Sequence, residues 1–107
     1  MTDQSNLPLS EQYRLAAKEW VELDAAASLL EETKSAVLSQ KMAACGDVPV
    51  NRAELQVKAS PEWASHLMKM TEARRKANLS KVKLEWIRMR FSEQQSHEAT
   101  KRAEMKL

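Results

Sequence analysis

The chain contains very little glycine, cysteine or histidine, and each shortage argues against a kind of site. Gly46 is the only glycine among 107 residues, so there is no glycine-rich loop to hold a phosphate group. Cys45 is the only cysteine, which rules out an intramolecular disulfide and fits a reducing cytosol. His66 and His97 lie far apart in the sequence, without a cysteine or carboxylate cluster beside them. We therefore predict no metal site and no cofactor.

Long apolar segments are also missing. The apolar runs are only a few residues long, whereas a membrane-spanning helix needs roughly 20. The first residues lack the basic segment and apolar core of a secretory signal. Serine and threonine are present, but no histidine and aspartate can be placed beside them to activate a nucleophile. We expect a soluble, cytoplasmic protein that does not contact a membrane, is not an enzyme and has no catalytic residues.

Helix-forming residues are abundant. Charged residues make up 30% of the chain and aromatic residues 5%, a composition typical of long helices. We predict helices at about 10–44, 52–58 and 61–104, with a flexible arm at 1–9 and a frayed end at 105–107. The residues that set these boundaries as caps, stops or first helical positions are Ser10, Gly46, Asn51, Ser60 and Pro61.

Apolar and small residues recur at spacings of three and four in both long helices, which predicts two matching seams. In the first helix the seam, with one polar break at Lys34, consists of Tyr13, Ala16, Trp20, Leu23, Ala27, Leu30, Lys34 and Val37. In the last helix it consists of Met70, Ala73, Ala77, Ser80, Leu84, Ile87 and Phe91. Two seams joined by a short connector predict an all-α fold: a long antiparallel helical hairpin with a short connector helix.

The residues beside the seams predict how the two helices align. Both edges of the last helix are basic, and the first helix carries acidic residues at the corresponding positions. Like positions face each other in an antiparallel pair, so one register satisfies charge and packing together. This register pairs Glu31 with Arg74, Asp24 with Lys81 and Glu19 with Lys83. Exposed ion pairs contribute little free energy, so these charges select the register more than they hold the fold.

A second apolar stripe lies opposite the seam of the last helix, which we call the back face: Leu79, Val82, Trp86 and Met89. A helix that is apolar on two sides is expected to be buried on two sides. We predict that the back face mediates homo-oligomerisation, with two hairpins forming a four-helix bundle. Two alternatives remain open: the groove of a different protein, or the connector helix folding back through Leu55 and Val57.

Basic residues on the last helix suggest a second hypothesis. Several of them remain unmatched by the first helix, and Trp86 among them could stack on an unpaired base. The candidate nucleic-acid-binding residues are Arg75, Lys76, Arg88 and Arg90. The net charge of +2 is too small to indicate a nucleic-acid partner by itself, and no known nucleic-acid-binding motif is present.

The segments "EWVELDAAASLLEETKSAVLSQ", "ASPEWASHLMKMTEARRKANLSKVKLEWIRMRF" and "EATKRAEMKL" resemble small helical proteins encoded by phages and prophages, in early or recombination-associated regions. The resemblance covers most of the chain and rests on the general character of the sequence, without a diagnostic motif. It implies a bacterial cytoplasm and an accessory role, either assisting a recombination protein or blocking a host nuclease or defence complex. We therefore expect a non-enzymatic accessory protein that binds a bacterial or phage protein. The alternative is a single-stranded nucleic-acid-binding factor in DNA recombination.

Overall fold

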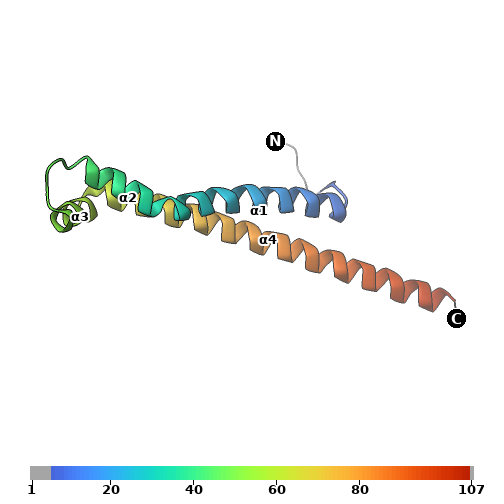
Figure 1. Ribbon diagram of the computed structural model, residues 1–107. Helices are drawn as coiled ribbons and strands as arrows, with labels where there is room; N and C mark the ends of the chain where they lie inside the picture. The colour runs from blue at the N-terminus through green and yellow to red at the C-terminus, as the bar shows by residue number, and fades with distance from the viewer. Residues whose placement is uncertain (1–5, 107) are drawn as a thin grey trace. The chain divides into compact units, whose positions relative to one another are not determined.

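The computed structural model describes residues 6–106, and in this part of the chain all regular structure is helical. Four helices follow one another: α1 (Leu9–Glu32), α2 (Lys34–Ala43), α3 (Val50–Lys58) and α4 (Pro61–Met105) (Figure 1). The long helix α4 packs against α1, and α2 and α3 provide the connection between them. The predicted all-α helical hairpin is confirmed. None of the described helices is long and apolar enough to cross a membrane.

The chain divides into two compact units that share the long helices. The terminal unit consists of Met1–Glu22 and Asn78–Leu107, and the inner unit consists of Leu23–Ala77. The terminal unit therefore holds the first part of α1 and the last part of α4. The inner unit holds the rest of both helices together with α2 and α3.

The core of each unit is made largely of small side chains from the predicted seams. In the terminal unit Ala16, Ser80 and Ile87 are buried. In the inner unit Ala27 and Ala77 have no exposed surface at all. Alanine at such positions lets two helices approach closely, because no side chain extends beyond the Cβ atom. Five seam residues therefore occupy the core positions that their spacing predicts, whereas Tyr13 and Lys34 are exposed.

A second group of buried residues lies in the inner unit, where α3 meets the start of α4. Ala53 and Val57 on α3 are buried, and so is Trp63 in the first turn of α4. Ser60 caps α4 as predicted, because its Oγ accepts a hydrogen bond from the Trp63 backbone N–H at 3.2 Å. Pro61 is the first residue of α4, a position that needs no backbone donor.

The first predicted helix is interrupted at Thr33, which the sequence pattern does not indicate. Instead of one helix at 10–44, α1 ends at Glu32 and α2 begins at Lys34, with Thr33 between them at φ −90° and ψ 0°. The Thr33 hydroxyl donates a hydrogen bond to the Leu29 carbonyl at 2.7 Å. Such back-bonding competes with the regular helical ladder and bends helices. The Val37 N–H still bonds to the Thr33 carbonyl at 2.9 Å, so the interruption is local.

Two predicted caps are wrong. Ser10 lies inside α1, which begins at Leu9, and the Glu11 and Gln12 N–H groups bond to the Pro8 carbonyl. Asn51 lies inside α3, which begins at Val50 with no side-chain cap. In both cases the helix starts directly after a proline, whose restricted φ prepares the helical conformation.

The structure describes only part of the two predicted chain ends. Residues 1–5 of the predicted arm, and Leu107 at the predicted frayed end, lie outside the described residues. α4 continues to Met105, and every residue from Ser92 to Lys106 is exposed. This last segment carries few apolar side chains, so it has no second apolar surface to bury.

Candidate protein-binding face

The back face lies on α4 in the terminal unit, and all four of its side chains are exposed. The exposed fractions are 56% for Leu79, 62% for Val82, 51% for Trp86 and 54% for Met89. The seam residue Ile87, on the other side of the same helix, is only 4% exposed. α4 therefore has one buried apolar side and one open apolar side in this stretch.

The alternative in which the connector helix covers the back face does not fit these exposures. A covering helix would leave the four side chains largely buried, and each is more than half exposed. Leu55, which that alternative required as a contact, is itself 70% exposed. Val57 is buried within the inner unit. The back face is therefore an open apolar surface of the single chain.

Trp86 is the largest side chain of this surface, and Arg90 covers one face of its ring. The Arg90 guanidinium lies over the Trp86 ring, with its central carbon 4.9 Å from the ring centre. The two residues are four positions apart and therefore neighbours on one face of the helix. A guanidinium over an indole ring is attractive because the ring face is electron-rich. Arg90 thus belongs to the rim of the apolar surface.

One edge of the back face is basic and is partly neutralised within the terminal unit. Its cations there are Lys83 and Arg90, in the same heptad position. Lys83 Nζ lies 3.7 Å from Glu19 Oε2, which confirms that predicted pair. Lys81, at the other edge of the seam, lies with Nζ 6.0 Å from the centre of the Trp20 ring.

In the inner unit the predicted register is fixed by Arg74, which binds two carboxylates together. Its guanidinium donates to Glu31 at 2.7 and 2.9 Å, which confirms that pair, and to Asp24 at 2.7 Å. The predicted partner of Asp24 was Lys81, so this assignment is wrong. A forked guanidinium can bond two acids at once, which a point-charge ammonium does less well. Arg74 also donates to the Ser28 hydroxyl at 3.3 Å.

This clamp shifts the pKa values of Glu31 and Arg74. The hydrogen bonds from Arg74 hold the pKa of the Glu31 carboxyl below its usual value. The bonds to Glu31 and then Asp24 raise the pKa of Arg74. All three side chains are partly exposed. The arrangement is therefore an ion-pair clamp between α1 and α4.

The four predicted nucleic-acid-binding residues divide between the two units. In the inner unit Arg75 is held by Glu72, with bonds of 2.5 and 2.9 Å, and these bonds raise the pKa of Arg75. Lys76 is exposed and borders a hollow that is lined mainly by apolar residues. In the terminal unit Arg90 lies over Trp86, and Arg88 is exposed. Two of the four are therefore already engaged within the chain.

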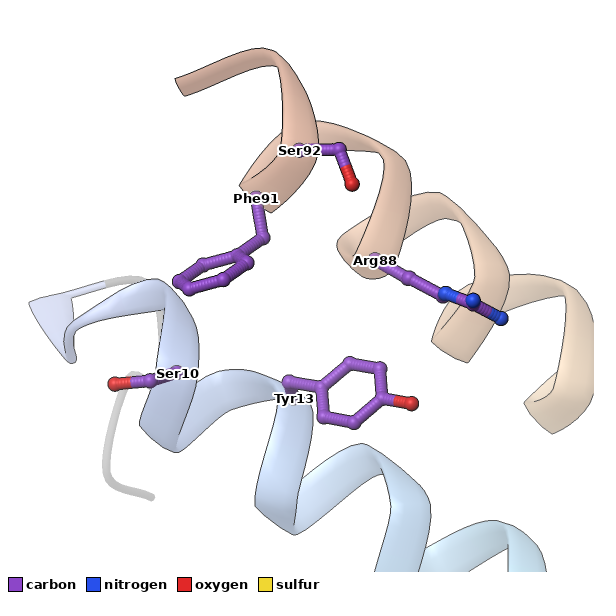
Figure 2. Close-up of a pocket in the computed structure, with 5 residues that line it drawn as sticks. All are labelled: Ser10, Tyr13, Arg88, Phe91 and Ser92. Atoms are coloured by element: carbon purple, nitrogen blue, oxygen red, sulfur yellow. The ribbon is translucent and has the colours of Figure 1, made fainter. Parts of the chain in front are cut away.

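A small pocket in the terminal unit lies at the end of the seam. It has a volume of about 270 Å³ and is lined by Ser10, Tyr13, Arg88, Phe91 and Ser92. Figure 2 shows the Phe91 ring pointing from α4 toward α1, with Ser10 and Tyr13 on the facing helix. Tyr13 and Phe91 were predicted as ordinary seam residues. The pocket lies where the α1 and α4 side chains no longer fill the space between the two helices. The spacing of residues in the sequence does not predict where this happens.

Neither histidine nor any acid cluster offers a metal site within the described residues. The His66 ring stacks on Trp63 with the ring centres 5.6 Å apart, which is a packing arrangement. Two buried polar atoms, His66 Nε2 and Ser80 Oγ, have no hydrogen-bond partner among the residues described. Comparison of the chain with protein-family models, curated proteins and solved structures finds no match.

Proposed function

We propose that the protein is a non-enzymatic accessory protein that acts by protein–protein binding and self-association through the back face of α4. The exposure of Leu79, Val82, Trp86 and Met89 carries this proposal. Isolated exposed apolar residues are common on proteins, but a contiguous patch centred on tryptophan is typical of a binding surface. Burial of this patch by a partner removes apolar area from water, which is the main favourable term in association.

The resemblance to small phage and prophage proteins supplies the setting for this proposal. It favours a location in the cytoplasm of a bacterial host, with a bacterial or phage protein as target. The target class would be a nuclease, defence or recombination complex, which the protein would modulate or inhibit by occupying a surface. The proposal needs no catalytic residue, cofactor or metal.

Substitution of the back face tests the proposal. Trp86→Ala and Met89→Glu are expected to lower the mass measured by light scattering, and to abolish retention of any partner captured by the wild type. Met105→Glu is a matched control, because Met105 is also on α4 and 81% exposed but lies outside the back face. An unchanged mass and unchanged retention in the two back-face variants would refute the proposal.

The alternative function is binding of single-stranded nucleic acid along α4, and the exposure of Arg88 and Lys76 favours it. Binding of this kind depends on phosphate contacts and weakens steeply with salt. Fluorescence anisotropy of labelled single-stranded DNA would then show salt-sensitive binding, lost on the combined reversals Arg88→Glu and Arg90→Glu. No binding at low salt would exclude this alternative and leave the protein-binding proposal unaffected.

A further inference from the structure

We infer that the hollow beside Lys76 is a second binding site, which takes an acidic amphipathic helix of a different protein. The hollow has a volume of about 320 Å³ and is lined by residues of both α1 and α4. All of its lining residues belong to the inner unit, whereas the back face lies in the terminal unit. The site therefore shares no residue with the back face and does not depend on the proposed function.

The two edges of the helix pair differ in the inner unit, and the hollow lies at the open edge. At the closed edge the Arg74 guanidinium bonds to Asp24 at 2.7 Å and to Glu31 at 2.7 and 2.9 Å. At the open edge α1 contributes Ala26, whose side chain is a single methyl group. A methyl group neither fills the space to α4 nor pairs with a charge there. The hollow is therefore open because α1 has a small, uncharged side chain at this position.

The floor of the hollow is apolar. It is formed by Leu23 and Leu30 of α1 and by Ala73 of α4, and each of the three is only partly buried. The two leucines lie seven residues apart, which is about two helical turns. An apolar side chain placed between them removes their remaining exposed surface from water. The floor therefore fits the apolar face of a third helix packed against the pair.

The rim of the hollow is basic. Lys69 and Lys76 of α4 line it and are exposed, and neither forms a salt bridge within residues 6–106. They lie roughly 10.5 Å apart along the helix, at ~1.5 Å per residue. One acid, Glu72, also lines the hollow, but Arg75 bonds to it at 2.5 and 2.9 Å. These bonds hold the pKa of Glu72 below its usual value, and the charge of Lys76 lowers it further. The two lysines therefore leave the rim positive.

An apolar floor below a positive rim is complementary to a helix with apolar residues on one face and acids beside them. Helical faces recur about every seven residues, so two acids seven apart on the partner lie opposite Lys69 and Lys76. A helix also bonds its own backbone groups, whereas an extended segment would bury some of them unpaired. Single-stranded nucleic acid fits the lysines but not the floor, which offers no aromatic ring on which a base could stack.

Binding of designed peptides tests the inference. The probe is a helical peptide of about three heptads, with leucine on one face and glutamate at flanking positions seven apart. Two matched peptides carry glutamine or lysine in place of glutamate. A ¹H–¹⁵N NMR titration of the full chain is expected to show saturable shifts at Ala26, Lys69 and Lys76 with the glutamate peptide. The Kd of the glutamine peptide is expected to be about tenfold weaker. No shifts at millimolar glutamate peptide, or equal Kd values for these two peptides, would overturn the inference.

Variants of the hollow test its floor and its rim separately. Ala26→Leu fills the floor and is expected to weaken binding by about tenfold or more. Ala25→Leu is the matched control, because Ala25 is also exposed but does not line the hollow. The combined reversals Lys69→Glu and Lys76→Glu are expected to switch the preference from the glutamate peptide to the lysine peptide, and circular dichroism checks that each variant is folded. Equal binding by Ala26→Leu and Ala25→Leu, or an unchanged preference in the double reversal, would contradict the inference.

The outcomes separate this site from the proposed function. Trp86→Ala is expected to leave the Kd of the glutamate peptide unchanged, because Trp86 lies in the terminal unit. Loss of peptide binding in this variant would place the peptide on the back face and overturn the inference. Concentration-dependent shifts of Lys69 and Lys76 without peptide would make a second copy the occupant, which also overturns it. The same holds if labelled single-stranded DNA shifts these two lysines and the glutamate peptide does not.

Discussion

Ser80 occupies a core position in the terminal unit, where a hydroxyl brings a cost. It is 7% exposed, and its Oγ has no hydrogen-bond partner among the described residues. A buried hydroxyl that loses its water contacts without finding a partner is destabilising. The neighbouring seam residue Ala77 shows that alanine fits such a position. This part of the seam requires a small side chain, and the Ser80 hydroxyl contributes nothing to the packing.

Ser80→Ala is therefore expected to stabilise the protein by about 1 kcal/mol, since it removes an unsatisfied hydroxyl and improves helix propensity. Urea unfolding followed by circular dichroism would show a higher midpoint at an unchanged slope. Ser92→Ala is the control, because Ser92 is exposed on the same helix. A lower midpoint for Ser80→Ala would mean that the hydroxyl has a partner in solution that the seam depends on.

Arg74 and Glu31 give the inner unit a defined pH dependence. The pKa of Glu31 lies below its ordinary value of 4.5, because Arg74 donates hydrogen bonds to the carboxylate. A carboxylate of this kind contributes its full stability above pH 4.5, and the contribution is lost as the pH falls through the lowered pKa. We expect unfolding midpoints measured between pH 7 and pH 3 to fall more for the wild type than for Glu31→Gln. Equal slopes would contradict this account.

At the scale of helices, the sequence predicts the long helices α1 and α4. It does not predict the break between α1 and α2. The seams at spacings of three and four predict α1 and α4, because burial of one side stabilises a helix over its whole length. The break at Thr33 depends on one side-chain hydrogen bond to Leu29. Threonine is common within helices, so the sequence alone does not show where such a bond forms.

The turn that follows α2 contains Gly46, which has a positive φ of 83°. Only glycine adopts this conformation without steric cost. A Cβ atom at this position would meet nothing within 4 Å, so the penalty of a substitution is purely conformational. Gly46→Ala is expected to destabilise the protein by about 1–2 kcal/mol, and Gly46→Asn by less. Equal midpoints for Gly46→Ala and the wild type in urea unfolding would refute the role of this residue.

At the scale of the whole molecule, periodicity accounts for the hairpin fold and for the choice of the back face. The Glu31–Arg74 and Glu19–Lys83 pairs follow from charge and register together. The second bond of Arg74, to Asp24, does not, because the reach of a guanidinium is not expressed by heptad position. The pocket beside Tyr13 and Phe91 also escapes prediction, since it reflects how far the helices separate at the end of the seam.

The central claim is that a protein partner buries Trp86, and ¹⁹F NMR of the chain labelled with 5-fluorotryptophan tests it directly. Trp86 is 51% exposed in the single chain and Trp63 is 4% exposed, so Trp63 provides an internal reference. As the concentration is raised to form the dimer, the Trp86 resonance is predicted to shift and to lose its sensitivity to D₂O, while the Trp63 resonance stays unchanged. A Trp86 resonance that remains solvent-sensitive in the associated protein would contradict the account.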